Sequence, residues 1–197
     1  MEAQWAPVFG VNVADFNGDG SEDLFLAQNF FATSKTLPRL DAGRGLLLLG
    51  DGKGGFTPQP GQRSGVLVYG EQRGSAVADF DGDGRVDLVV SQNGNQTKLL
   101  RNQTAQPGLR VRLKGPAHNP AAVGAVIRPS IGSQPGPARE LRAGSGYLSQ
   151  DSLVQVFGGV VTKLEVRWPG GTKTESVVPP NSLEVEVTAD GAARKVK

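Results

Sequence analysis

Two nine-residue stretches place oxygen-bearing side chains at a fixed spacing. Residues 15–23 and residues 79–87 both follow the pattern D-x-[DN]-x-D-G-x-x-D, with oxygens at positions 1, 3, 5 and 9. A hard cation such as Ca²⁺ takes about 6–8 oxygen ligands at roughly 2.3–2.6 Å, and alternate residues of a curled loop can face one centre. We therefore predict two calcium sites with these ligands: Asp15, Asn17, Asp19, the carbonyl of Ser21 and Asp23 in the first, and Asp79, Asp81, Asp83, the carbonyl of Arg85 and Asp87 in the second.

The same two stretches could in principle form an EF-hand or a turn without a metal. An EF-hand would need a bidentate Glu at position 12 and a helix on each side, but position 12 is Leu26 or Val90 and the flanks are short apolar runs typical of strands. A solvated Asp/Gly turn without a metal is the other alternative, and the repetition of four oxygens in both loops favours calcium over it. Because the second loop has four carboxylates and the first has three, we expect tighter binding at the second.

Composition points to an all-β protein of one or two domains. The chain of 197 residues has 28 Gly and 13 Pro and shows no long helical periodicity. Its net charge is +2, and its basic residues are scattered singly along strands, which favours a solvated strand face over a polyanion-binding surface. We therefore expect no nucleic-acid partner. No apolar run is long enough for a membrane span, and residues 1–5 lack the features of a signal peptide.

Other chemistries find little support. The chain has no cysteine, and its single histidine, His118, lies between two prolines in an expected loop, so thiolate, zinc and triad chemistry are all disfavoured. Trp168 alternates with Leu164 and Val166, which favours the core over an exposed sugar platform. The stretch 144–150 is glycine-rich, and we expect a bulge or packing loop rather than a binding loop. We predict that this chain is not an enzyme.

The calcium loops belong to an internal repeat. Residues 11–29 and 75–93 are identical at 11 of 19 positions, and each loop joins two strands, as expected for blades of a β-propeller. In the first repeat, residues 45–50 are expected to form a buried strand, residues 51–55 a turn and residues 65–69 a closing strand. The second repeat can be followed only to about Arg101. A polar linker, residues 102–108, then separates two predicted domains, 1–105 and 107–197.

The second half alternates apolar and charged residues. Residues 109–114, 163–168 and 183–187 predict half-buried strands of an antiparallel sheet, with weaker candidates at 123–127, 140–142 and 153–157. Turn residues such as Pro169-Gly170-Gly171 separate them. We predict a small β-sandwich or barrel.

These residues carry a family resemblance. Residues 14–24 and 78–88 resemble FG-GAP/VCBS repeats, the calcium-loop blades of integrin-type propellers. Residues 109–187 resemble the ASPIC/UnbV domain, with matching stretches at 144–150 and 166–171. The order of the two is similar to the C-terminal part of the cartilage-acidic-protein-like family.

The resemblance implies an extracellular or periplasmic, calcium-stabilised module for adhesion or protein interaction, with a protein or glycan partner at a cell surface or matrix. An accessory carbohydrate-binding region of a larger exported enzyme is the alternative. Family propellers usually have about seven blades, so the resemblance also implies a fragment of a larger ring. Blades that cannot close a ring leave faces uncovered, and we expect the C-terminal domain to cover one, with self-association as the second route.

Overall fold

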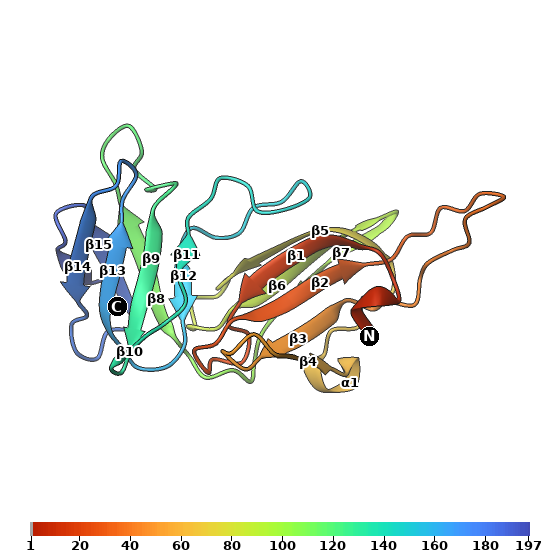
Figure 1. Cartoon of the computed structure of the whole chain (residues 1–197), viewed down its shortest axis with the longest axis horizontal. Coiled ribbons are helices and arrows are strands. Elements are labelled where there is room, and N and C mark those ends of the chain that lie inside the picture. Colours follow the sequence, from red (N-terminus) through yellow and green to blue (C-terminus); the bar gives the residue numbers. More distant parts are fainter. Residues whose placement is uncertain (1) are drawn as a thin grey trace.

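The computed structural model describes residues 2–197, and these form an elongated all-β molecule in two parts (Figure 1). The N-terminal part contains the strands up to β7, and the C-terminal part contains β8 to β16. No helix in residues 2–197 has the length and apolar character that crossing a membrane requires. The bounds are η1 Glu2–Gln4, β1 Val8–Ala14, β2 Asp23–Gln28, β3 Leu46–Gly50, β4 Phe56–Gln59, α1 Gly61–Ser64, β5 Glu71–Ala78, β6 Asp87–Asn93, β7 Asn95–Leu100, β8 Leu109–Lys114, β9 Val126–Ile131, β10 Gln134–Pro135, β11 Arg139–Glu140, β12 Gln155–Phe157, β13 Val161–Arg167, β14 Lys173–Val177, β15 Glu184–Thr188 and β16 Ala193–Lys195.

The N-terminal part consists of two antiparallel sheets that pack face to face. The first has the order β1-β2-β3-β4 and the second the order β5-β6-β7, so the repeat yields one blade of four strands and one of three. Each aspartate loop joins the first two strands of its sheet, as the sequence predicts. Between the sheets lies a buried core made of Phe25, Ala27, Val66, Val68, Leu88 and Val90.

The predicted strand at 65–69 is wrong. The fourth strand of the first sheet is β4, which pairs with β3 across the turn after Gly50. Residues 65–69 instead form an extended connection, and Val66 and Val68 are 6% and 2% exposed between the two sheets. The alternation of Val66 and Val68 therefore reflects burial in a connecting segment, because the same pattern arises wherever an extended chain buries one side.

The repeat gives the two sheets equivalent faces with different surroundings. Ser75 on β5 packs against the first sheet and is 3% exposed, whereas Val11, its counterpart on β1, is 48% exposed. Val77 also packs against the core between the sheets, whereas its counterpart Val13 is 51% exposed. The first sheet thus leaves open the face that the second sheet buries.

The C-terminal part is a β-sandwich. One sheet has the order β10-β9-β13-β14 with β11 also on β9, and the other has the order β12-β8-β15-β16. The β8–β15 pair is parallel, so the expectation of a purely antiparallel domain is wrong at this pair. Trp168 is buried, and its indole N–H donates to Thr174 Oγ1 at 2.8 Å, which confirms a core role. The core of this part is Leu109, Val111, Leu113, Ala122, Ala125, Ile127, Leu141, Phe157, Leu164, Val166, Trp168, Val185 and Val187.

The C-terminal part packs along the free edge of the second sheet. Asp151 accepts hydrogen bonds from Asn12 Nδ2 at 3.0 Å and from the Val77 amide at 2.8 Å, and the Ser152 amide donates to the Val77 carbonyl at 2.8 Å. These contacts lay residues 150–154 along β5, at the rim of an apolar cavity of about 660 Å³ that Val89 and Leu99 of the second sheet also line. The expectation that the C-terminal domain covers a blade face is therefore met only along this edge: Leu99 on the outward face of the second sheet stays 46% exposed, and Val11 and Val13 leave the outward face of the first sheet open.

We predict that this open face drives weak self-association. Burying one large aliphatic side chain contributes about 1.5–3 kcal/mol, so Val13→Lys should remove concentration-dependent growth in mass measured by light scattering. Val160→Lys, at a 75% exposed position of the C-terminal part, is the matched control and should leave association unchanged. A wild-type chain that stays monomeric at every concentration would contradict this prediction.

Candidate metal centres

The first aspartate of each loop holds the loop in its curled shape. Asp15 accepts hydrogen bonds from the amides of Gly18, Asp19 and Gly20 at 2.7, 3.1 and 2.8 Å. Asp79 accepts the three equivalent bonds in the second loop, from Gly82 at 2.8 Å, Asp83 at 3.1 Å and Gly84 at 2.7 Å. The two copies therefore share one local structure.

Glycine at positions 4 and 6 is required by the backbone of both loops. Gly18 and Gly20 have φ of 78° and 89°, and Gly82 and Gly84 have φ of 74° and 84°. Residues with a Cβ rarely adopt this left-handed region, so only glycine turns the chain twice within three residues at low cost.

The ninth position ties each loop to the following strands. Asp23 accepts the Phe16 amide at 2.8 Å through one oxygen and the Gly50 amide at 2.9 Å through the other. In the second loop, Asp87 accepts the Phe80 amide at 2.9 Å and the Asn102 amide at 2.8 Å. Asp23 and Asp87 are 0% and 2% exposed. A buried carboxylate thus joins the loop to the end of the third strand in each sheet.

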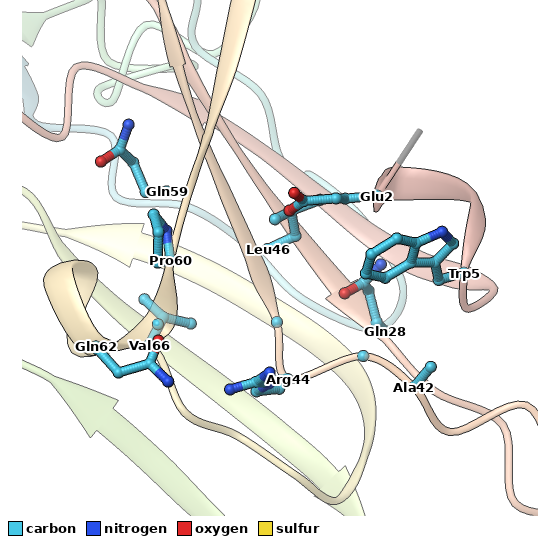
Figure 2. A pocket seen from close by; sticks show the side chains of 13 residues that line it. Glu2, Trp5, Gln28, Ala42, Arg44, Leu46, Gln59, Pro60, Gln62 and Val66 are labelled. Carbon is cyan, nitrogen blue, oxygen red and sulfur yellow. The ribbon is translucent and has the colours of Figure 1, made fainter.

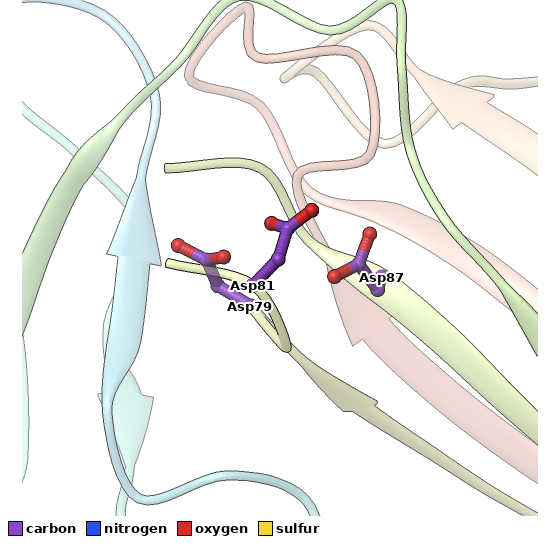
Figure 3. Close-up of side chains that lie close together, drawn as sticks. All are labelled: Asp79, Asp81 and Asp87. Atoms are coloured by element: carbon purple, nitrogen blue, oxygen red, sulfur yellow. The ribbon is translucent and has the colours of Figure 1, made fainter. Parts of the chain in front are cut away.

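Three of the predicted ligands gather in the second loop. Asp79, Asp81 and Asp87 each place a carboxylate oxygen within 4.8 Å of the others (Figure 3). Clustered carboxylate oxygens are the donors that hard cations such as Ca²⁺ prefer. The three side chains therefore fit a bound cation, while Asp83 turns away and pairs with Arg85 at 2.8 Å. That pair uses the side chain of Arg85, and a ligand role for its carbonyl stays a prediction.

The first loop is arranged differently at positions 3 and 5. The Asn17 side chain donates to Asp19 Oδ2 at 2.8 Å, and its oxygen accepts the Asp19 amide at 3.0 Å. Asp19 Oδ1 in turn accepts the Ser21 amide at 2.7 Å. Asn17 and Asp19 are thus engaged with each other, and among residues 2–197 the close group of three carboxylates forms only in the second loop.

The charges of the first loop are poorly compensated. Burial raises the pKa of Asp23 to about 6; the Gly50 and Phe16 amides oppose this shift, whereas the neighbouring charges of Asp15 and Asp19 add to it. Burial also raises the pKa of Asp15 against the opposing effect of the loop amides. A cation among these carboxylates would relieve the same desolvation and repulsion, so the electrostatics of the first loop fit a cation as well.

Arginine side chains compensate the negative charge of the second loop. Two of these arginines lie outside residues 79–87, and the sequence pattern does not predict their positions. Arg110 forms an ion pair with Asp79, and Arg101 forms one with Asp81. Together with Arg85 they place a guanidinium on three of the four carboxylates of the loop. The second loop has one more carboxylate than the first, but these guanidinium groups compete with a metal ion for the same oxygens. The expected gain in calcium affinity is therefore offset.

Arg110 also connects the loop to the C-terminal sandwich. Its Nε donates to Glu184 Oε2 on β15 at 2.9 Å, while its other nitrogen reaches Asp79. Burial alone would raise the pKa of Glu184, but hydrogen bonds from Arg110 and Arg112 outweigh it and hold that pKa below its usual range. Arg110 is thus shared between a predicted calcium ligand and the other part of the molecule.

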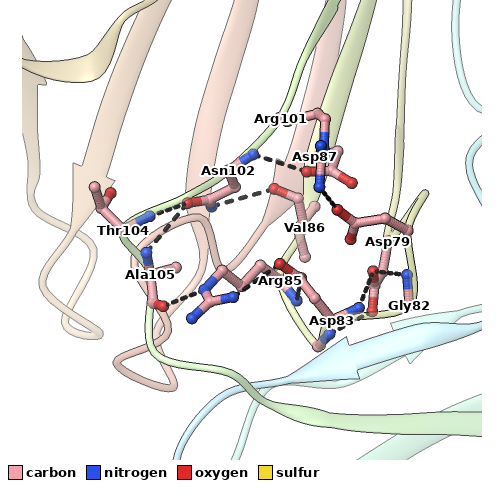
Figure 4. A network of polar contacts seen from close by, with 12 residues as sticks. Asp79, Gly82, Asp83, Arg85, Val86, Asp87, Arg101, Asn102, Thr104 and Ala105 are labelled. Atoms are coloured by element: carbon pink, nitrogen blue, oxygen red, sulfur yellow. Dashed lines mark hydrogen bonds and ion pairs between the residues drawn. The ribbon is translucent and has the colours of Figure 1, made fainter.

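The predicted linker contributes structure that sequence analysis missed. Asn102 donates from its side chain to the carbonyls of Phe16 and Val86 at 2.8 and 3.2 Å, so it joins both loops. Arg85 donates to the Ala105 carbonyl at 2.7 Å within the same network (Figure 4). The available signal is that residues 99–102 (LLRN) begin with a Leu-Leu pair as residues 47–50 (LLLG) do, which makes Asn102 the counterpart of Gly50.

The C-terminal part also packs on the first loop. A Cβ at Gly158 would overlap Asp15 Oδ2, so glycine is needed for this approach. Arg139 forms an ion pair with Glu22 at 2.7 Å, and its guanidinium lies 4.6 Å from the centre of the Phe157 ring. Both loops therefore lie at the junction between the blades and the sandwich.

Comparisons with known proteins match each part of the chain separately. Residues 15–90 match the model of the FG-GAP-like repeat, and residues 115–194 match the model named ASPIC and UnbV. The chain joins an FG-GAP-like repeat to an ASPIC/UnbV domain. It is also similar to Cartilage acidic protein 1 of Xenopus tropicalis, at 32% identity over 112 residues, which covers 52% of this chain and 17% of that relative. The chain therefore spans a small share of this relative.

We predict that Arg110→Ala tightens calcium binding at the second loop. Removing a partly buried guanidinium from Asp79 removes a competing cation, and we expect an affinity about tenfold higher by calorimetry, equivalent to about 1.4 kcal/mol.

Arg112→Ala is the matched control, because Arg112 contacts the same Glu184 at 3.0 Å without reaching the loop. It should leave the calcium affinity unchanged. Equal affinities in wild type and Arg110→Ala would show that Arg110 does not compete with the cation.

Proposed function

We propose that both aspartate loops bind Ca²⁺ and that the chain is a calcium-stabilised, non-catalytic interaction module that acts outside the cytoplasm. The observation that carries this proposal is the group formed by Asp79, Asp81 and Asp87 at the junction of the two parts. Their oxygens offer a hard cation several ligands from one loop, and the equivalent backbone geometry of the first loop supports a second site.

The position of the loops supports a structural role for the cation. Asp15 lies against Gly158, and Asp79 is paired with Arg110, so each first-position carboxylate contacts the C-terminal sandwich or the segment that enters it. A cation bound only in the folded state would stabilise that state by about 2.7 kcal/mol at 100 times its dissociation constant. Bound calcium would thereby hold the blades and the sandwich in a fixed arrangement that a partner can recognise.

An interaction role outside the cytoplasm is supported by the two matched families. FG-GAP-like repeats and ASPIC/UnbV domains are typical of extracellular or periplasmic proteins, and that typical setting offers calcium and surface partners. A non-catalytic role is supported by His118, which is exposed in the loop after β8. The partner we expect is a protein or glycan at a cell surface or matrix.

We predict a calcium stoichiometry of two for the wild-type chain. Asp19→Ala and Asp83→Ala each remove a position-5 carboxylate, and titration calorimetry should then find one site in each variant. Asp51→Ala is the matched control, because Asp51 also accepts two backbone amides in an Asp-Gly turn, from Lys53 and Gly55, but lies outside both loops.

Asp51→Ala should retain both sites. Two sites in every variant would refute the assignment of the ligands, and no sites in the wild-type chain would refute the calcium proposal itself.

A further inference from the structure

A cavity of about 240 Å³ lies at the end of the first sheet that is remote from its aspartate loop (Figure 2). Its wall combines the N-terminal turn with Glu2 and Trp5, the last residue of β2, the segment that leads into β3, and the β4–α1 connection. This volume is slightly below the roughly 300–1,000 Å³ typical of drug-sized ligands, so it suits one small ring.

The cavity collects polar side chains that have no partner within residues 2–197. Five such side chains line it, and none forms a side-chain hydrogen bond or ion pair with another described residue. They come from four separate segments, yet they converge on one space: Glu2, Gln28, Arg44, Gln59 and Gln62.

Gln28 is the most informative of them. The residue is only 3% exposed, and its amide borders the cavity beside Trp5 (Figure 2). Its amide has no hydrogen-bond partner within residues 2–197 and faces the space of the cavity, since the fully buried and unpaired side-chain atoms of these residues are Gln72 Oε1 and Ser149 Oγ. Gln28 therefore presents both a donor and an acceptor to the cavity.

Trp5 adds an apolar surface to this polar wall. Its side chain is 60% exposed and borders the cavity, whereas the other tryptophan, Trp168, is 4% exposed in the sandwich core. An exposed indole beside unpaired amides offers one flat apolar surface and several hydrogen-bonding groups at the same place.

We infer that this cavity binds one ring of a neutral saccharide. A sugar ring has an apolar C–H face that can stack on Trp5, and its hydroxyl groups both donate and accept, as the amides of Gln28, Gln59 and Gln62 do. The single carboxylate of Glu2 and the single guanidinium of Arg44 cancel in charge, which favours an uncharged ligand over an anion or a cation. The site shares no residue with the aspartate loops, so its occupancy does not depend on calcium.

The test is a titration with a panel of methyl glycosides (glucoside, mannoside, galactoside and N-acetylglucosaminide), monitored by the fluorescence of Trp5 and by saturation-transfer NMR. We expect saturable millimolar binding of at least one glycoside, equal in calcium and in EDTA. Trp5→Ala and Gln28→Leu should each weaken it by about tenfold or more. Tyr69→Ala, at a 62% exposed aromatic outside the cavity, should leave it unchanged.

Thermal melting separates lost binding from lost folding, and Gln62→Ala at the exposed rim is a second variant that keeps the fold. Failure of every glycoside to saturate would overturn the proposal. So would glycoside binding that is unaffected by Trp5→Ala, Gln28→Leu and Gln62→Ala, or saturation by zwitterionic amino acids with no response to sugars. If the chain binds a glycoside but no calcium, the calcium proposal alone is refuted.

Discussion

Buried carboxylates that satisfy backbone amides organise this molecule. Each nine-residue loop turns too sharply to pair its amides with other backbone groups, so Asp15 and Asp79 accept three of them apiece. Asp23 and Asp87 then connect each loop to the end of the third strand. Because an unpaired buried amide costs about as much as a lost hydrogen bond, these aspartates determine the loop shape even before a cation is considered.

The same arrangement places several carboxylates close together, and the two loops differ in how their negative charge is compensated. Burial and repulsion raise the pKa of Asp23 to about 6 in the first loop, where the ion pair of Arg139 falls on Glu22 and not on a predicted ligand. In the second loop Arg85, Arg101 and Arg110 each pair with one carboxylate. A count of the loop's own carboxylates therefore overestimates the negative charge at the second site. Two of the three arginines, Arg101 and Arg110, lie 20 or more positions along the chain from the carboxylates that they pair with.

Sequence reasoning succeeded where local pattern and local geometry coincide. The loops, their glycines and the flanking strands follow from spacing alone, since each depends on residues within about ten positions. It failed where a distant contact decides the outcome: Val66 and Val68 alternate like a strand but fill the space between two sheets. The short strands β14 and β16 were missed because Lys173–Val177 and Ala193–Lys195 have a weak apolar pattern and depend on their neighbours β13 and β15. Arg110 looked like one of several solvated strand cations until the fold placed it beside Asp79.

The most direct test of the calcium account is a crystal grown in calcium and measured at a wavelength where calcium scatters anomalously. The account predicts one anomalous peak in each aspartate loop, surrounded by oxygens at about 2.3–2.6 Å, with Arg110 withdrawn from Asp79. Loops that show no peak, with Arg101 and Arg110 still paired to their carboxylates, would contradict it.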